Sequence, residues 1–263
     1  MGVVALVPVA GPAGQFGPYS VPDIGVANAD AGLSAAVEIP LLAPILNNLF
    51  AVDCIDLVAL VVPHSQIAET TSALSDTADR ANLADRTGKA VEVIGVDEST
   101  FDSTYSIITK ALDLLPKTAS VVLVHQLRHA YAPPELIRAV VDAVLAGAPA
   151  AVPVLPCTDT VKQLDEVGVI IDTPDRTTLR VNQAPLGFDI RHLNGPDAHL
   201  SSPARDTPGL NWFPSGARTV PGHPAARAIR TSFDLAFAQA SQVGQETAAG
   251  ETPAATSQVS SEV

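Results

Sequence analysis

Short apolar runs alternate along the chain with stretches in which apolar residues recur every three or four positions. The apolar runs predict strands at residues 3–10, 56–63, 90–96, 120–125 and 150–156. The helical spacing between them predicts helices near residues 41–50, from Ser65, and over residues 104–115 and 133–147. This alternation favours right-handed crossovers, and it predicts an α/β fold with a mostly parallel sheet and helices on both faces.

The pattern changes after Cys157. Two short β-like segments, residues 167–172 and 178–183, flank a turn that contains Pro174 and Asp175, and they predict a β-ribbon projecting from the main sheet over about residues 157–184. Residues 194–221 are rich in proline and glycine and predict a long ordered loop, followed by a last helix over residues 232–240. Residues 242–263 have few apolar residues, contain Glu and lack Lys and Arg, so they predict a disordered acidic tail after a domain of residues 1–241.

Composition narrows the class of protein. Hydrophobic residues make up 47% of the 263 residues and aromatic residues only 4%, so Ala, Val, Leu and Ile must build the core. The net charge of −13 argues against nucleic acid and anionic membranes as partners. No apolar stretch has the length of a membrane span, and no basic residue precedes the first apolar run, so a cytoplasmic protein is expected.

The first predicted strand runs into a turn of glycine, alanine and proline, GPAGQFGP at residues 11–18. Many α/β proteins hold a phosphate at such a turn, through backbone N–H groups. However, no Lys or Arg occurs before Arg80, so the formal charges available near this turn are negative. The turn is therefore either a phosphate loop without cations or a plain connection between strand and helix.

Several stretches together resemble the 2-C-methyl-D-erythritol 4-phosphate cytidylyltransferase family of the non-mevalonate isoprenoid pathway. They occur in the family's order: VPVAGPAGQFG, VHQLRHA, PCTDTVK, TPDR, QAPLGF and PGHPAARAIRT. The resemblance implies a Rossmann-like three-layer fold of the nucleotide-diphospho-sugar transferase type. It also implies transfer of a cytidylyl group from CTP to methylerythritol phosphate, with magnesium present and pyrophosphate released.

The resemblance places the remnant of the nucleotide loop at five residues: Ala10, Gly11, Gly14, Gln15 and Gly95. Gln15 stands where the family has Arg, and the family's later Lys has no counterpart. After Gly95 the family's Arg is missing, Asp97 and Glu98 make the segment acidic, and Ser103 is the candidate match for the family's Ser. Either segment is alternatively a turn or surface loop without a ligand.

Two further positions of the expected nucleotide site lack the charge that the family has there. Gln126 replaces the carboxylate that the family holds near magnesium, and a neutral amide is a weaker ligand. Arg128 is one position early, and strand alternation turns it to the opposite face unless the turn has already begun. Ala228 replaces the family's Lys, with Arg227 and Arg230 beside it.

The resemblance is stronger in the ribbon. It implies that the ribbon is exchanged between protomers and that its residues contact the sugar-alcohol phosphate; the candidates are Asp159, Thr160, Lys162 and Arg176. The expected partner is a second copy, in a homodimer through the ribbon, or an active family member in a mixed dimer. Alternatively, these residues only fix the ribbon's fold. The match weakens again at Ala184 and Leu186.

The losses concentrate where CTP and metal bind, and removing one preorganised charge commonly costs about 10² to 10³ in rate. The first hypothesis is therefore a catalytically impaired or inactive homologue. The alternatives are an active nucleotidyltransferase with altered substrate or cation placement, and a structural or regulatory dimer partner. No cofactor is assigned, with magnesium and CTP expected only if the protein is active. No metal ligand is predicted, and three histidines are interpreted as structural: His125, His129 and His223.

Overall fold

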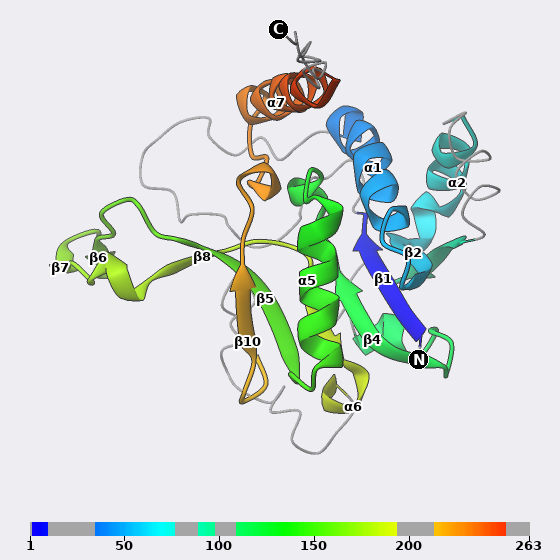
Figure 1. Cartoon of the computed structure of the whole chain (residues 1–263), viewed down its shortest axis with the longest axis horizontal. Coiled ribbons are helices and arrows are strands. Elements are labelled where there is room, and N and C mark those ends of the chain that lie inside the picture. Colours follow the sequence, from blue (N-terminus) through cyan, green and yellow to red (C-terminus); the bar gives the residue numbers. More distant parts are fainter. Residues whose placement is uncertain (1, 10–34, 77–88, 98–108, 194–212, 251–263) are drawn as a thin grey trace, which may run out of the picture.

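The computed structural model describes residues 2–9, 35–76, 89–97, 109–193 and 213–250. Within them, an eight-stranded sheet has the order β10-β5-β9-β4-β1-β2-β3, with β8 paired to β5 (Figure 1). The strands are β1 (Gly2–Pro8), β2 (Ile55–Pro63), β3 (Ala90–Val96), β4 (Ala119–Val124), β5 (Ala150–Pro156), β8 (Arg180–Asn182), β9 (Leu186–Asp189) and β10 (Arg218–Pro221). β8 and β9 pair antiparallel with their neighbours and the other pairs are parallel, which confirms the mostly parallel sheet.

Helices cover the sheet. The α-helices are α1 (Ala35–Phe50), α2 (Ile67–Asp76), α5 (Pro134–Leu145), α6 (Ile190–Leu193) and α7 (Ser232–Gly250), and residues 109–112 are also helical. Short 3₁₀ helices follow several strands: η1 (His64–Gln66), η3 (Leu127–His129), η4 (Arg176–Thr178) and η6 (Pro224–Ala226). None of the helices in the described part of the chain is long and apolar enough to cross a membrane.

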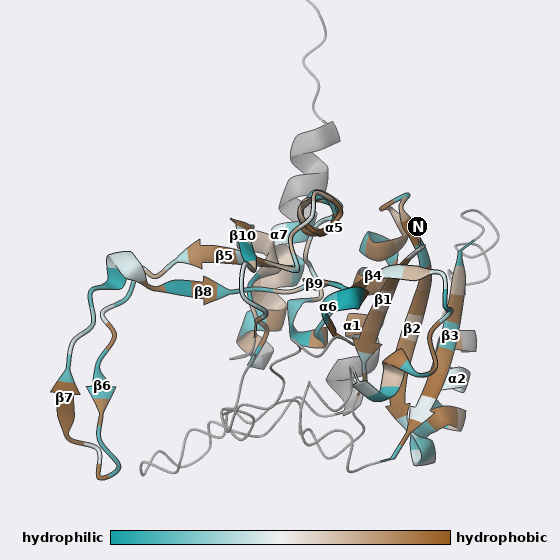
Figure 2. Ribbon diagram, turned by 90° about the horizontal axis from the view of Figure 1, so that it is seen from below, coloured by the Kyte–Doolittle hydropathy of each residue, from teal (hydrophilic) through white to brown (hydrophobic). Residues whose placement is uncertain are grey.

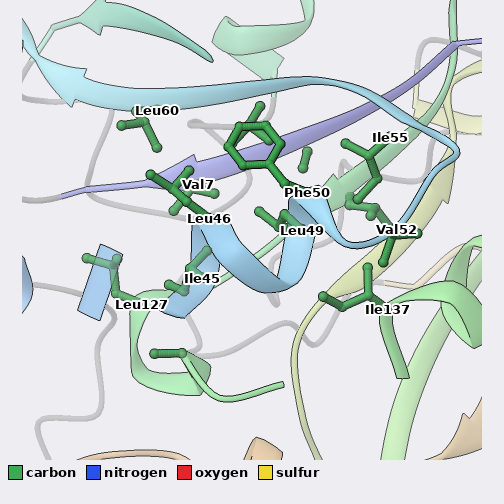
Figure 3. Packing of buried hydrophobic residues seen from close by; sticks show 14 of the residues in the cluster. Val7, Ile45, Leu46, Leu49, Phe50, Val52, Ile55, Leu60, Leu127 and Ile137 are labelled. Atoms are coloured by element: carbon green, nitrogen blue, oxygen red, sulfur yellow. The ribbon is translucent and has the colours of Figure 1, made fainter. Parts of the chain in front are cut away.

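The two faces of the sheet are separated by the alternation of side chains along each strand. In β1, Val3, Ala5 and Val7 join a core under α1 and α5, whereas Val4 and Leu6 join the core on the opposite face. Figure 3 shows the first core, where residues of α1 such as Ile45 and Leu49 meet the strands and Ile137 of α5. Because both faces are covered, β1 and β2 are continuous apolar runs with almost no exposed residue.

A long β-arm leaves the sheet between β5 and β9, and we call residues 157–184 the arm. It is the predicted projecting ribbon, but its pairing differs from the prediction. Residues 167–172 and 178–183 do not pair with each other: β7 (Ile170–Asp172) pairs with β6 (Gln163–Leu164), and β8 pairs with β5. The arm therefore bends at η4, and β6 and β7 form its tip, far from the sheet (Figures 1 and 2).

Two elements were missed by the sequence patterns because each is too short to show a period. β9 is four residues long and fits between β4 and β5, where Gly187 allows α5 to pack closely: an added Cβ would lie 2.7 Å from Val140 Cγ1. β10 lies within the stretch predicted as a loop. The remainder of that stretch up to residue 212 lies outside the described residues.

The C-terminal helix is longer than predicted. α7 continues to Gly250, nine residues into the segment predicted as a disordered tail from residue 242. Five of these nine residues are Ala, Gln or Glu, which have high helix propensity. Residues 251–263 of the predicted tail lie outside the described residues.

Candidate functional site

The candidate site lies at the carboxyl ends of β1 and β4. Chain order reverses there, since β2 and β3 extend the sheet on one side of β1 and β4 on the other. Open α/β sheets bind ligands at such a switch point, outside the carboxyl ends of the strands. Two hydrogen bonds continue the pairing beyond β1 and β4, from Val9 N–H to Val61 O (2.8 Å) and from His125 N–H to Leu6 O (2.8 Å). We call this region the carboxyl edge.

Most of the predicted nucleotide loop lies outside the described residues. Ala10, Gly11, Gly14 and Gln15 fall in residues 10–34, and Ser103 falls in residues 98–108, so the structure does not place them. Gly95 is described, in β3. η1 and α2 pack closely against this glycine. An added Cβ would lie 2.5 Å from His64 Nδ1 and from Ile67 Cδ1. A close approach between β3 and the preceding η1 and α2 therefore explains this glycine without a ligand.

Beyond Gly95, His64 Nε2 lies 3.9 Å from Asp97 Oδ1, and both side chains are mostly exposed. The carboxylate of Asp97 thus pairs with a histidine whenever that histidine is protonated. Asp97 is an acidic group at the end of β3, as the sequence indicated.

His125 is completely buried at the end of β4. Its Nδ1–H donates to the Gln126 carbonyl (3.2 Å), and its Nε2 has no hydrogen-bond partner among the described residues. Burial, with a contribution from His129, lowers the pKa of His125 to about 3, so the ring is neutral at physiological pH. The prediction that this histidine is structural agrees with its burial.

Gln126 follows His125 and is half-buried. It has an extended backbone and precedes η3, which begins at Leu127. The turn has therefore begun at Arg128, so strand alternation does not decide where that side chain points. Arg128 is half-buried and lies on η3 rather than on β4.

Two hydrogen bonds join η3 to the segment of residues 226–230. The His129 Nδ1–H donates to Ala226 O (2.7 Å), and the Ile229 N–H donates to Arg128 O (2.7 Å). Ala228 lies between these two contacts and is half-buried. The segment therefore lies beside η3, and at the position where the family has Lys this chain has only the methyl group of Ala228. His129 is a buried structural residue, as predicted.

Cations nevertheless gather near this contact. Burial lowers the pKa of His129 to about 4; the hydrogen bond with Ala226 opposes the shift, and the positive charges of Arg128 and Arg230 add to it. Arg227 and Arg230 are exposed. The charges of Arg128 and Arg230, one from each segment, thus lie close enough to His129 to act on it, and position 228 carries no charge.

A capping box fixes the turn after Arg230. The Asp234 carboxylate accepts hydrogen bonds from the Thr231 N–H (2.9 Å) and hydroxyl (2.9 Å), and Thr231 Oγ1 accepts from the Asp234 N–H (3.1 Å). Burial acts to raise the pKa of Asp234, but these hydrogen bonds outweigh it and lower the pKa, so a charged carboxylate caps the first turn of α7. The cap holds the 226–230 segment in place.

Gln183 is a positioning residue that the sequence analysis missed. Its side chain is buried; its amide donates to His223 O (2.9 Å), and its Oε1 accepts from the His223 N–H (2.8 Å). His223 Nδ1 accepts from the Ala225 N–H (3.1 Å), and its Nε2 lies 4.0 Å from Glu135 Oε1. The available signal was a glutamine at the end of the β-like segment of residues 178–183, where the family pattern of residues 183–188 begins.

The structure does not bring the substrate-phosphate candidates to the carboxyl edge. Asp159, Thr160, Lys162 and Arg176 are all exposed on the arm. Arg176 donates to Thr158 O (2.8 Å) and Lys162 Nζ to Thr173 Oγ1 (2.8 Å), so both cations bridge the arm internally. Within one chain, the arm points away from the edge (Figure 1).

Magnesium fits poorly among the described residues of the edge. Mg²⁺ favours carboxylate oxygens, and at the end of β4 the candidate donor is the neutral amide of Gln126. In the described part of the chain, no group of three or more His, Cys, Asp or Glu residues could hold a metal ion.

Comparison with known proteins decides the family. The model of the 2-C-methyl-D-erythritol 4-phosphate cytidylyltransferase family matches residues 37–242. The chain belongs to this family. A cytidylyltransferase of that name from Saccharopolyspora erythraea is 38% identical over 91% of this chain and 99% of its own length. The one from Rhodococcus jostii is 33% identical over 90% and 94%.

Solved structures agree with this fold. The 4-diphosphocytidyl-2C-methyl-D-erythritol synthase of Anaerococcus prevotii matches with a TM-score of 0.64 at 19% identity, covering 92% of this chain and 96% of that one. The Thermus thermophilus cytidylyltransferase matches with a TM-score of 0.55 at 21% identity, covering 91% and 98%. The predicted family and Rossmann-like fold class are thereby confirmed.

Proposed function

We propose that this cytidylyltransferase-family protein carries out CTP- and magnesium-dependent cytidylyl transfer to methylerythritol phosphate poorly or not at all. The observation that carries the proposal is the carboxyl edge, where Gln126 follows the buried, neutral His125 and Ala228 lies in the segment beside η3, so both positions present neutral side chains. The reaction is the cytidylyl transfer for which the relatives are named, and the residues of this chain argue against efficient catalysis of it.

The physical argument concerns charge. Negative charge develops on the triphosphate as the bond to pyrophosphate breaks, and fixed cations in a water-poor site stabilise it. Magnesium would supply that charge if bound, but an amide oxygen holds it less well than a carboxylate. The Ala228 methyl group can offer no charge, and the exposed Arg227 and Arg230 place theirs elsewhere.

Restoring the charges tests the proposal. We expect no measurable CTP turnover by the purified wild-type chain under conditions in which the Saccharopolyspora erythraea relative is active. Gln126→Asp with Ala228→Lys should raise pyrophosphate release from CTP and methylerythritol phosphate, with Gln15→Arg adding to the gain. Gln126→Glu is the matched control, because it adds the charge with a longer side chain. Wild-type turnover comparable to that of the relative would overturn the proposal.

A second candidate is an active nucleotidyltransferase that uses relocated cations. The contact between η3 and the 226–230 segment favours it, because the charges of Arg128 and Arg230 both act on His129. In that case the wild type turns over, and Arg230→Ala lowers kcat at least about tenfold, since a lost fixed cation costs this much or more. Exposed Arg218 gives the control substitution Arg218→Ala, which should leave kcat unchanged.

The arm supports a proposal about partners. We propose that it joins this chain to a second copy, or to an active family member whose site would then receive Thr160 and Arg176. The support is unequal loss: CTDTVK and TPDR keep the family pattern, whereas the edge does not. Native mass spectrometry of this chain co-expressed with an active relative should show the mixed species. Arg176→Ala should then raise the KM of the partner's site for methylerythritol phosphate. If only homodimers form, the mixed dimer is wrong.

A further inference from the structure

Two apolar surfaces are left uncovered in the described part of the chain. Eleven large apolar side chains are exposed there; seven belong to the arm, two to α7, and Leu114 and Leu145 are isolated. On the arm, the tip (residues 163–172) exposes 83% of Val167 and more than half of Val169, Ile170 and Ile171. Figure 2 shows this apolar strand, β7, at the end of an otherwise mixed ribbon.

The second surface lies on the outer side of α7. Leu235 and Ala238 pack toward the core, whereas Phe233 and Phe237 are 75% and 56% exposed, with Ala236 and Ala240 exposed between and beyond them. These four residues recur at helical spacing and form one stripe. We call them the outer face of α7. A pair of exposed phenylalanines one turn apart on a capped helix is a rigid apolar surface of the kind that anchors interfaces.

The geometry points to the outer face of α7 as the seat for the arm tip of a second copy. This inference rests on the arm-mediated association proposed above and specifies where the arm binds. The arm cannot cover its own α7 in this structure, because its tip lies far to the side of the sheet (Figure 1). A two-fold pair of chains would form the contact twice, which doubles the apolar area buried.

Charge complementarity distinguishes this seat from the alternatives. The tip carries Asp165, Glu166 and Asp172 and has no Lys or Arg within residues 163–172. The exposed Arg227 and Arg230 precede the outer face of α7, and the one carboxylate in its first turn, Asp234, already caps the helix. Two tips packed on each other would oppose like charges, and so would two copies of α7 with their arginines.

The arm is also ordered before it binds. Asp165 Oδ1 accepts from the N–H groups of Val167 (3.0 Å) and Val169 (2.8 Å), which fixes the turn of the tip. The Lys162–Thr173 bond closes the base of the tip. Such preorganisation lowers the entropy lost on association, so a small apolar tip can contribute measurable affinity.

Photo-crosslinking tests the seat directly. A benzophenone amino acid at position 237 of the full-length chain is irradiated in a mixture of ¹⁵N-labelled and unlabelled copies, and the cross-linked peptides are sequenced. We expect products that join position 237 to residues 163–172 of the other copy. Products joining it to the partner's α7, to another segment or to its own chain would overturn the inference.

Dissociation constants, measured by analytical ultracentrifugation, separate this inference from the proposal beneath it. Phe233→Ser with Phe237→Ser should weaken the dimer at least about tenfold, whereas Leu145→Ser, at an exposed apolar residue elsewhere, should not. Glu166→Lys and Arg230→Glu should each weaken it, and the two together should recover most of the loss. If Ile170→Ser with Ile171→Ser breaks the dimer and the α7 variants do not, the arm associates but α7 is not its seat. A wild-type monomer at high concentration overturns this inference and the proposed homodimer, whereas the mixed dimer is tested separately by the co-expression experiment.

Discussion

The carboxyl edge and the arm differ in the contacts that hold them together and in how far their polar groups are buried. At the edge, polar groups are buried and neutral, and contacts between residues distant in sequence hold them, such as His129 with Ala226 and Gln183 with His223. On the arm, charged groups are exposed, and residues within twenty positions of one another hold them, such as Arg176 with Thr158. The edge can keep its fold without a charge at Gln126 or Ala228, because its hydrogen bonds run through backbone atoms. The arm can keep its charges because they remain in water.

Acid should destabilise the edge and not the arm. His125 and His129 are neutral in the fold, with pKa values lowered to about 3 and about 4, while the unfolded chain binds protons near pH 6.5. Their contribution is fully present above that pH and is lost as pH falls toward the folded pKa values. By pH 5 each should have cost about 2 kcal/mol of unfolding free energy.

Urea unfolding at pH 7.5 and pH 5 measures this loss. His129→Gln should halve it, whereas His64→Gln, at an exposed histidine, should leave it intact. An unfolding free energy that is equal at the two pH values would show that the buried histidines are not neutral in the fold.

A methyl group should be tolerated differently at a glycine of each region. At Gly222 an added Cβ would lie 2.9 Å from the carbonyl carbon and oxygen of Val154 and closer still to the Gln183 amide, so the edge must shift. Gly222→Ala should cost about 2 to 3 kcal/mol, as overpacking does.

In the arm, Gly168 has φ +87° and open space around it, so Gly168→Ala should cost only about 1 kcal/mol of backbone strain. Thermal unfolding of both variants gives the comparison. Equal shifts in Tm would mean that the two regions do not differ in packing.

Removing a cation of the arm should have a small effect on the stability of the isolated chain. Lys162→Met and Arg176→Met each delete an exposed hydrogen bond, which is worth at most about 1 kcal/mol. Chemical denaturation at low and high salt should show this small difference. A loss of several kcal/mol would mean that these bridges hold the fold and not only the arm.

The end of α7 should matter least. The described contacts of α7 with the body, through Leu235, Ala238 and the Gln239 hydrogen bond to Tyr131, all precede residue 242. Truncation after Gln242 should therefore shift Tm by no more than about 1 °C, because the described contacts that hold α7 on the domain are all kept. Differential scanning calorimetry measures it, and a larger drop would show that the end of α7 packs on the domain.

The sequence by itself determined the family, the α/β class and the main strands, because buried parallel strands are continuous apolar runs whose boundaries are visible. β2, β3 and β5 lie within one residue of their predicted positions. It also indicated the neutral residues of the edge, since Gln126 and Ala228 can be read from the chain alone.

Only the tertiary structure decided what has no local signal. β9 and β10 are strands because neighbouring strands complete them, since each has too few residues to show a period of its own. The two predicted segments of the ribbon do not pair with each other: β8 pairs with β5 and β7 pairs with β6, because pairing depends on where the chain bends. Gln183 and His129 acquired their roles from residues 40 and 97 positions away, and no sequence pattern specifies contacts at such separations.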